Sequence, residues 1–167
     1  KKIMPERFSQ TENVPEKGKE LEVKAVSSEE WEEYKRLRLE ALKSDPGSFI
    51  ESLEEESKRS DEYWMNYLKN IETHDGPKLL AARSGDRFIG MAGYFKRNKQ
   101  AAGINGLYVS KDQRGTDVSD RLMESIIEIA KKNPDIKTLE LMVRKDLKQA
   151  INLYEKFGFK KAGKAKS

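Results

Sequence analysis

The spacing of apolar and polar residues changes several times along the chain, and each change predicts an element. Apolar residues alternate with polar ones over residues 21–25, as in a half-buried strand. Ser27 with Glu30 three residues later forms a capping-box pattern, which predicts that a helix begins there and ends before Pro46. A second helix is predicted from Asp61, because apolar residues from Trp64 to Ile71 recur at helical spacing.

The second half of the chain predicts most of a sheet. Residues 78–83 and 87–95 form a hairpin pattern, and residues 101–109 a third strand. A helix over residues 117–132, a strand over residues 139–143, a last helix capped by Asp146 and Gln149 and ended by Gly158, and a short final strand follow. The strand–helix–strand crossover places one parallel pair in an otherwise antiparallel sheet flanked by helices, an α+β (α/β) fold. Residues 1–20 show no sustained period and are interpreted as an arm, so one domain is expected over residues 21–167.

The composition of the chain limits the kinds of catalytic and metal-binding site that it can form. Charged residues make up 37% of the 167 residues, and no apolar run approaches the roughly 20 residues that span a bilayer, so we expect a cytoplasmic protein without a membrane partner. The chain has no cysteine and one histidine, His74, which excludes disulfides, thiolate metal sites and multi-histidine zinc sites and argues against a serine–histidine triad. We therefore expect no metal, and chemistry that uses carboxylates, tyrosine, backbone amides or a cofactor.

The net charge of +4 is modest. Much of it lies in four lysines near the C-terminus: Lys160, Lys161, Lys164 and Lys166. No aromatic residues alternate with them, so a solvated tail is favoured over a nucleic-acid or ribosome contact, which remains a third alternative.

The strongest functional signal lies between Gly103 and Arg121. A strand that ends at Val109 passes through a polar, glycine-containing loop and then opens a helix, an arrangement that directs backbone N–H groups at a bound phosphate. The expected turn consists of Gln113, Arg114 and Gly115, and the first helical turn of Thr116, Asp117, Val118 and Ser119. A pyrophosphate there would meet unpaired amides and the positive end of the helix dipole.

Together these residues resemble the GNAT superfamily of acyl-CoA-dependent N-acyltransferases, over roughly residues 21–163. The resemblance depends on Leu107-Tyr108-Val109 before Gln113-Arg114-Gly115, on Asp146 to Ala150, and on Leu153 to Phe159, where a tyrosine precedes a Gly-Phe pair. Arg36 to Leu42, followed by Asp45-Pro46 and Phe49, is similar to the first helix and turn of many bacterial members.

The resemblance implies an N-acetyltransferase that moves an acetyl group from acetyl-CoA to a primary amine, either a small molecule or a peptide, by direct attack. The parallel strands would splay apart, with the pantetheine arm of coenzyme A along Leu107, Tyr108 and Val109 and the pyrophosphate over Arg114 to Ser119. A backbone N–H near Val109 would stabilise the oxyanion, and Tyr154 would protonate the departing thiolate. An alternative for Tyr154 is a tyrosine at the edge of the core.

The chain departs from the family pattern at several positions. Asp117 and Ser119 replace small residues in the phosphate loop. Three outcomes are open for coenzyme A: it binds normally because the Asp117 side chain turns outward, it binds more weakly, or it no longer binds. Residues 101–109 hold no carboxylate to serve as general base, so a water chain or a carboxylate elsewhere, such as Glu40, is needed. Leu147 stands where an asparagine is common, and the family's usual last strand would be missing, borrowed from a partner or replaced by the N-terminal arm.

These departures keep a second function open, a non-catalytic GNAT-fold binding or regulatory module with an impaired coenzyme A site. The amine, the acyl chain and the oligomeric state, including a homodimer, are not fixed by the sequence. Other notable residues favour structural roles. Trp31, Trp64 and Tyr67 are expected in the core, His74 in an exposed loop, and the acidic run Glu51, Glu54, Glu55 and Glu56 in a solvated segment.

Overall fold

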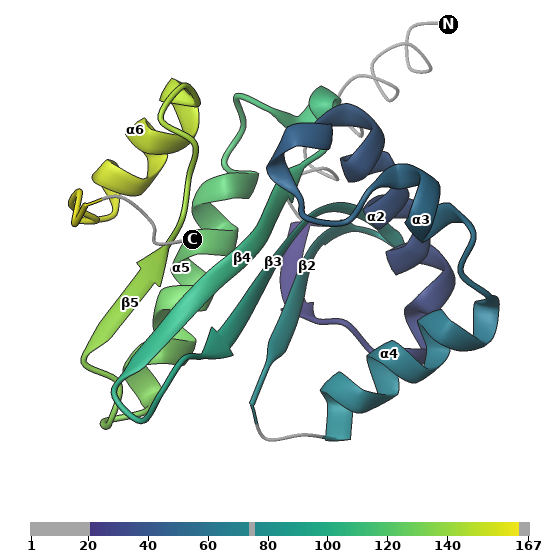
Figure 1. The fold of residues 1–167 in the computed structure, drawn as a ribbon, viewed down its shortest axis with the longest axis horizontal. Helices are drawn as coiled ribbons and strands as arrows, with labels where there is room; N and C mark the ends of the chain where they lie inside the picture. Colours follow the sequence, from purple (N-terminus) through teal and green to yellow (C-terminus); the bar gives the residue numbers. More distant parts are fainter. Residues whose placement is uncertain (1–20, 74–75, 164–167) are drawn as a thin grey trace, which may run out of the picture.

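Five strands form one sheet at the centre of the molecule (Figure 1). A computed structural model describes residues 21–73 and 76–163. The strands are β1 (Leu21–Ala25), β2 (Lys78–Ser84), β3 (Arg87–Lys96), β4 (Ala101–Val109) and β5 (Thr138–Leu141), in the spatial order β1-β2-β3-β4-β5. The first four are antiparallel to their neighbours and β4 pairs with β5 in parallel, so the predicted fold class is confirmed.

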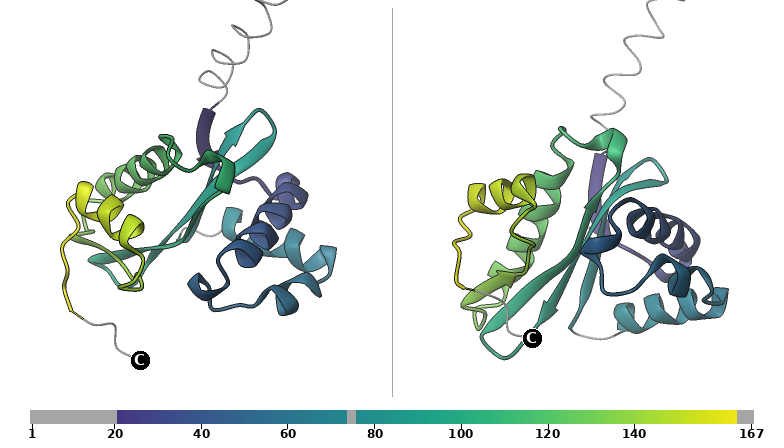
Figure 2. Two further views of the ribbon diagram at one scale, coloured as in Figure 1. Left: turned by 90° about the horizontal axis from the view of Figure 1, so that it is seen from above. Right: turned by 45° about the horizontal axis from the view of Figure 1, so that its top comes forward.

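Helices cover both faces of this sheet. One face is covered by α2 (Trp31–Ser44), α3 (Leu53–Ser57) and α4 (Asp61–Thr73), and the other by α5 (Val118–Lys132), with α6 (Lys148–Lys156) beside it (Figure 2). Three short 3-10 helices, η1 (Ser28–Glu30), η2 (Pro46–Ser48) and η3 (Lys111–Gln113), lie in the connections of the described chain. The sheet thus divides the molecule into two halves, one with α2, α3 and α4 and the other with α5 and α6.

Local signals explain where the first helix begins. The Ser27 side chain accepts a hydrogen bond from the backbone N–H of Glu29, and Glu30 returns a bond to the backbone N–H of Ser27, which completes the predicted capping box. The chain first makes the turn of η1 and then α2, whose apolar stripe packs on the sheet. Beneath α2 and α4, Trp64 and Phe88 are fully buried, and on the opposite face Leu122 and Ile126 of α5 fill a second core cluster.

The free end of β4 is shaped by a β-bulge. Gly93 pairs with Asn105 and Met91 with Tyr108, so β4 holds one more residue than β3 in this interval. Gly106 lies in the bulge with a φ of 61°, a conformation that disfavours residues with a Cβ. The pairing of β4 with β5 ends at Ile104, just before the bulge, so the two parallel strands separate there as the resemblance implied.

Three local predictions differ from the structure. The acidic run is solvated only in part, because Glu54 and Glu55 of α3 are exposed whereas Glu56 of the same helix is 3% exposed and binds Arg38 and Arg59. Asp146 does not cap α6, since its carboxylate accepts both hydrogen bonds of the Arg144 guanidinium. Residues 159–163 form no strand, although Gly158 ends α6 with a φ of 92°, as predicted.

The outcome for the aromatic residues is mixed. Trp64 is buried, Trp31 is half-buried, and Tyr67 is 38% exposed while it stacks between the rings of Tyr34 and Tyr63. The predicted arm at residues 1–20, His74 and the last lysines of the tail lie outside the described residues.

Candidate active site

The edge of β4 beyond Ile104 faces the gap between β4 and β5. Ser110 donates its backbone N–H to the carbonyl of Ile89 on β3, at 2.9 Å. Because backbone groups alternate along an antiparallel strand, the N–H and C=O of Val109 point the other way, toward the gap. The carbonyl of Val109 accepts a 3.0 Å hydrogen bond from Nε of Arg114, which agrees with this direction. The strand therefore offers main-chain hydrogen bonds to an extended ligand arm lying in the gap.

The loop after β4 leads directly into α5. Gly115 has a φ of 83°, and Thr116 lies in the turn with its hydroxyl donating to the carbonyl of Gln113. Within residues 21–73 and 76–163, no acceptor is present for the backbone N–H groups of Gly115, Thr116, Asp117, Ser119 and Asp120. The hydroxyl of Thr116 lies 3.4 Å from the N–H of Val118, a weak contact. The start of α5 thus presents a group of free amides, which is the requirement for holding an oxyanion.

Asp117 does not occupy these amides. It is the N-cap residue of α5, but its side chain is exposed and makes no capping hydrogen bond. Of the three outcomes left open by the sequence, this arrangement agrees with a side chain that turns outward. An exposed carboxylate at this position has rotational freedom to turn away from an incoming anion, while its charge still disfavours that anion.

Arg114 turns away from the loop amides and toward the first helix of the domain. Its Nη2 lies 3.3 Å from a carboxylate oxygen of Asp45, at the end of α2, and its guanidinium lies over the ring of Tyr108. Together with the bond to the Val109 carbonyl, these contacts join the loop, the β4 edge and α2. The side chain of Arg114 therefore fixes the loop and the β4 edge relative to α2.

Glu40, considered as a general base, is held by three donors. The phenol of Tyr108 and the hydroxyl of Ser110 donate to one oxygen at 2.8 and 2.7 Å, and Arg36 donates to the other at 3.0 Å. Burial alone would raise the pKa of Glu40, but the hydrogen bonds from Ser110, Tyr108 and Arg36 lower it below its ordinary value. A carboxylate with its oxygens occupied and its pKa lowered is a poor proton acceptor, so this geometry favours a structural clamp.

Arg36 extends the same clamp to β3. Its guanidinium binds Glu33 with two hydrogen bonds and donates to the carbonyl of Phe88, while Glu33 accepts from the N–H of Phe88 at 2.7 Å. Helix α2 is thereby fixed to two adjacent strands by charged hydrogen bonds. The sequence places Arg36 and Glu40 one helical turn apart, which was the available signal for this pair.

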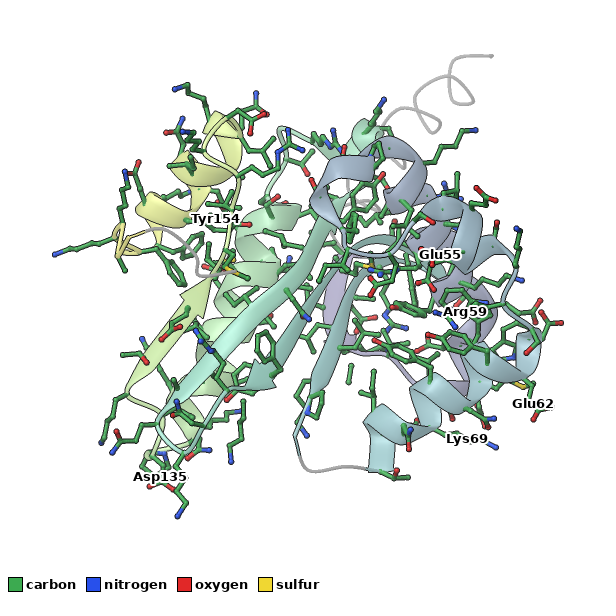
Figure 3. All side chains as sticks on the ribbon, in the orientation of Figure 1. Glu55, Arg59, Glu62, Lys69, Asp135 and Tyr154 are labelled. Carbon is green, nitrogen blue, oxygen red and sulfur yellow. The ribbon has the colours of Figure 1, made fainter. Side chains whose placement is uncertain are left out.

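Tyr154 lies on α6, on the other side of the gap (Figure 3). Its half-buried side chain packs against the α5 core cluster and meets Phe159 edge-to-face, with the ring centroids 6.1 Å apart. Burial raises the pKa of Tyr154 above its ordinary value, so the phenol keeps its proton at neutral pH. No hydrogen bond of this phenol is found among the described residues, which leaves its hydrogen available as a donor.

Two further residues around the gap were not predicted. Arg144, just beyond β5, reaches so close to Gly47 of η2 that a Cβ on that glycine would collide with the guanidinium. Because Arg114 binds the neighbouring Asp45, the η2 segment is contacted from both sides of the gap. Asn105, exposed at the bulge, lies over Gly93 on the α2 face of the sheet. In the sequence, Arg144 is only an arginine after a strand, and Asn105 only a neighbour of glycines inside strands. Neither pattern shows which residue the side chain will contact.

In the described portion of the chain there is no group of three or more metal-binding side chains, and no helix is long and apolar enough to cross a membrane.

Comparison with known families agrees with this geometry. Residues 25–159 match the model of the acetyltransferase (GNAT) family. The chain belongs to this family. Among curated proteins, no sequence matches the chain.

Solved GNAT structures share the fold at low sequence identity. An aminoglycoside acetyltransferase, HMB0005, from an uncultured soil metagenomic sample is 18% identical, with a TM-score of 0.70 over 88% of this chain and 96% of the other. AAC(6')-Iy, solved with the bisubstrate analogue CoA-S-monomethyl-acetylneamine, is 14% identical, with a TM-score of 0.68 over 88% and 95%. A ribosomal-protein-alanine N-acetyltransferase from Brucella melitensis biovar Abortus 2308 is 15% identical, with a TM-score of 0.64 over 88% and 96%. At these identities the likeness shows the fold alone.

Proposed function

We propose that residues 21–167 form an N-acetyltransferase domain that moves the acetyl group of acetyl-CoA to a primary amine by direct attack. The observation that carries the proposal is the open β4 edge leading into the free amides at the start of α5. Together they offer complementary contacts to the two parts of coenzyme A, an amide-containing arm and a pyrophosphate. Family membership supports acyl transfer as the type of reaction.

The proposed binding residues lie on both parts of this surface. The β4 edge from Leu107 to Val109 would bind the pantetheine arm as an added strand, with Tyr108 placed along the arm while its main-chain groups face β3. The amides from Gly115 to Ser119 would bind the pyrophosphate, with the α5 dipole adding to the attraction. Gln113 and Arg114 would shape the turn, and the Arg114 side chain would keep its present contacts with Val109 and Asp45.

The proposed chemistry needs few side chains. The amine nitrogen forms a bond to the thioester carbonyl carbon, the carbon–sulfur bond breaks, and the thiolate takes a proton from the Tyr154 phenol. The N–H of Val109, which points into the gap, would donate to the oxygen that becomes negative. Water is the favoured acceptor for the proton that the amine releases, since Glu40 is engaged by three donors.

The acceptor is proposed to be a small-molecule or peptide amine that enters from the α2 side. Aminoglycoside acetyltransferases and a ribosomal-protein-alanine acetyltransferase share the fold, so both amine classes are candidates. On this side, η2 and the exposed amide of Asn105 border the gap.

Calorimetric titration with coenzyme A tests the binding half of the proposal. We expect saturable binding, and release of free thiol from acetyl-CoA when a suitable amine is present. Absence of both heat and a thermal shift at millimolar coenzyme A would overturn the proposal.

Asp117→Asn separates the enzyme from the alternative of a non-catalytic module. A carboxylate about 4 Å from the pyrophosphate costs ~1 kcal/mol in water, so the variant should bind coenzyme A up to about fivefold more tightly at low salt. Glu62→Gln, which replaces an exposed carboxylate of α4 on the opposite flank of the molecule, is the matched control. Binding that appears only after Asp117 is replaced would favour the non-catalytic module. The exposed carboxylate motivates that alternative.

A further inference from the structure

Two adjoining open pockets, together called the basic cleft below, lie at the end of the sheet away from the acyl-transfer site. One, of about 300 Å³, is lined by Lys96, Lys99, Gln100, Asp135 and Lys137. The second, of about 290 Å³, shares Lys96 and is also lined by Lys78, Tyr94 and the end of α5. Figure 3 shows Asp135 at this end and Tyr154 toward the other. Because β4 is nine residues long, at about 3.3 Å per residue the two ends are separated by roughly 30 Å.

Backbone hydrogen bonds join the walls of this basic cleft. The carbonyl of Gln100, in the β3–β4 turn, accepts from the N–H groups of Lys137 and Thr138 at 2.6 and 3.1 Å. Asn98 closes the turn by accepting from the backbone N–H groups of Gln100 and Ala101, both at 2.9 Å. Asn133 closes the opposite loop in the same way, by accepting from the N–H of Asp135. These hydrogen bonds therefore fix the two loops that form the walls of the cleft.

The charge of the cleft is strongly unbalanced. Five lysines line the two cavities, Lys78, Lys96, Lys99, Lys132 and Lys137, against the single carboxylate of Asp135. Among the residues with described positions, no carboxylate pairs with Lys78, Lys96, Lys99 or Lys137. Lys132 has a structural explanation, since it lies in the last turn of α5 and 3.8 Å from Glu128. For the other four lysines, no described carboxylate offsets the charge, although Nζ of Lys137 donates to the carbonyl of Pro134 at 3.1 Å.

We propose that this cleft is a second ligand site, which binds a compact, multiply charged anion bearing phosphate or carboxylate groups. Lys99 and Lys137 line the first pocket, Lys78 lines the second, and Lys96 lines both, so an anion with several charged groups can contact ammonium groups from separate segments of the chain. The site lies outside the coenzyme A surface and does not depend on the acyl-transfer proposal.

The shape of the cleft favours a small polyanion over a nucleic acid. Binding of single strands uses exposed aromatic rings on which bases stack, whereas Tyr94, the aromatic residue in this lining, is 4% exposed. A volume of about 300 Å³ suits two or three anionic groups rather than a polymer.

Titration with inorganic tripolyphosphate tests this site, with coenzyme A saturating so that the α5 amides are occupied. We expect one binding event in calorimetry, with an affinity that falls as salt is raised. The double variant Lys96→Gln/Lys99→Gln should lose at least tenfold in affinity. Both side chains are exposed and form no ion pair with described residues, so folding should be unaffected. Lys69→Gln, on α4 at the opposite flank, is the matched control and should bind as the wild type does (Figure 3).

The outcomes separate this site from the acyl-transfer site. No binding of tripolyphosphate to the wild type, or equal binding by the double variant, would overturn the proposal even if coenzyme A binds normally. If coenzyme A fails to bind, loss of tripolyphosphate affinity in the double variant alone still supports the cleft. Citrate and pyrophosphate, which carry similar charge near neutral pH, distinguish a carboxylate ligand from a phosphate ligand, because at equal salt the preferred chemistry should bind more tightly.

Discussion

Tyr154 is the residue on which the proposed acid chemistry depends. Tyr154→Phe removes only a hydroxyl for which the described residues provide no hydrogen-bond partner, so the free energy of unfolding should change by less than about 1 kcal/mol. Loss of the proton donor should lower kcat about 100-fold or more, while the Kd for coenzyme A stays within about twofold. Burial raises the pKa of Tyr154, so the wild-type rate should decline only above about pH 10. Equal kcat values for Tyr154→Phe and the control Tyr63→Phe would assign Tyr154 to the core edge.

Glu40 differs from Tyr154 because its proposed task is structural. Glu40→Gln keeps an acceptor for Tyr108 or Ser110 but loses the ion pair with Arg36, and it should cost about 1–2 kcal/mol in the free energy of unfolding at pH 7. Its pKa is lowered in the folded state, so this stabilisation is present above about pH 4.5 and disappears as the pH falls through the folded value. Urea unfolding of both proteins from pH 3 to 8 measures it, and the exposed Glu124→Gln controls for general charge effects.

Kinetics of the same variant address the general base. A clamp predicts that kcat for Glu40→Gln falls less than about tenfold with an unchanged pH profile. A fall of a thousandfold with loss of the acidic limb would instead identify Glu40 as the base.

Among the elements, β4 positions the site, and its bulge gives a matched pair of variants. Gly106 and Gly85 share a φ of 61°, so replacing either with alanine should cost ~1–2 kcal/mol, or about 2–8 °C in Tm. Only Gly106→Ala should also weaken coenzyme A binding, because its bulge directs the Leu107 and Val109 amides into the gap, whereas Gly85 lies in the β2–β3 turn. Similar affinities for the two variants would show that the bulge does not position the ligand.

The elements also show how far the sequence was informative. Period and capping signals are local, so they predicted most helices and strands, including the Ser27 capping box. The partners of charged residues are set by tertiary packing, which local patterns do not encode. For that reason Glu56, within an acidic run, was expected in solvent, although it is buried and binds Arg38 and Arg59. The error at Asp146 has another cause, because its partner Arg144 is only two residues away and the sequence does not show which of two local contacts, the cap or the ion pair, will form. The family pattern indicated the proposed phosphate loop and Tyr154 as candidates, but not the contact of Arg114 with Asp45 or the clamp on Glu40.

At the scale of the whole molecule, the strands of the central sheet differ in how far they are buried and paired. β5 pairs with β4 over four residues, lies half-buried at the edge, and is followed by α6, which has no fully buried residue. β2 and β3 are buried over most of their length. Opening of the β5 and α6 region should therefore require less free energy than opening of the central strands.

Hydrogen exchange with and without coenzyme A measures both this difference and the proposed binding mode. In the free protein, amides of β5 and α6 should exchange faster than those of β2 and β3, because fewer buried contacts oppose their opening. Coenzyme A should slow exchange at residues 107–109 and 115–119, while β1 and β2 remain unchanged. Pantetheine, which has no pyrophosphate, should slow exchange at residues 107–109 but not at the start of α5. Uniform slowing across the molecule, or slowing at α5 by pantetheine, would contradict a ligand bound in two parts along β4 and the α5 amides.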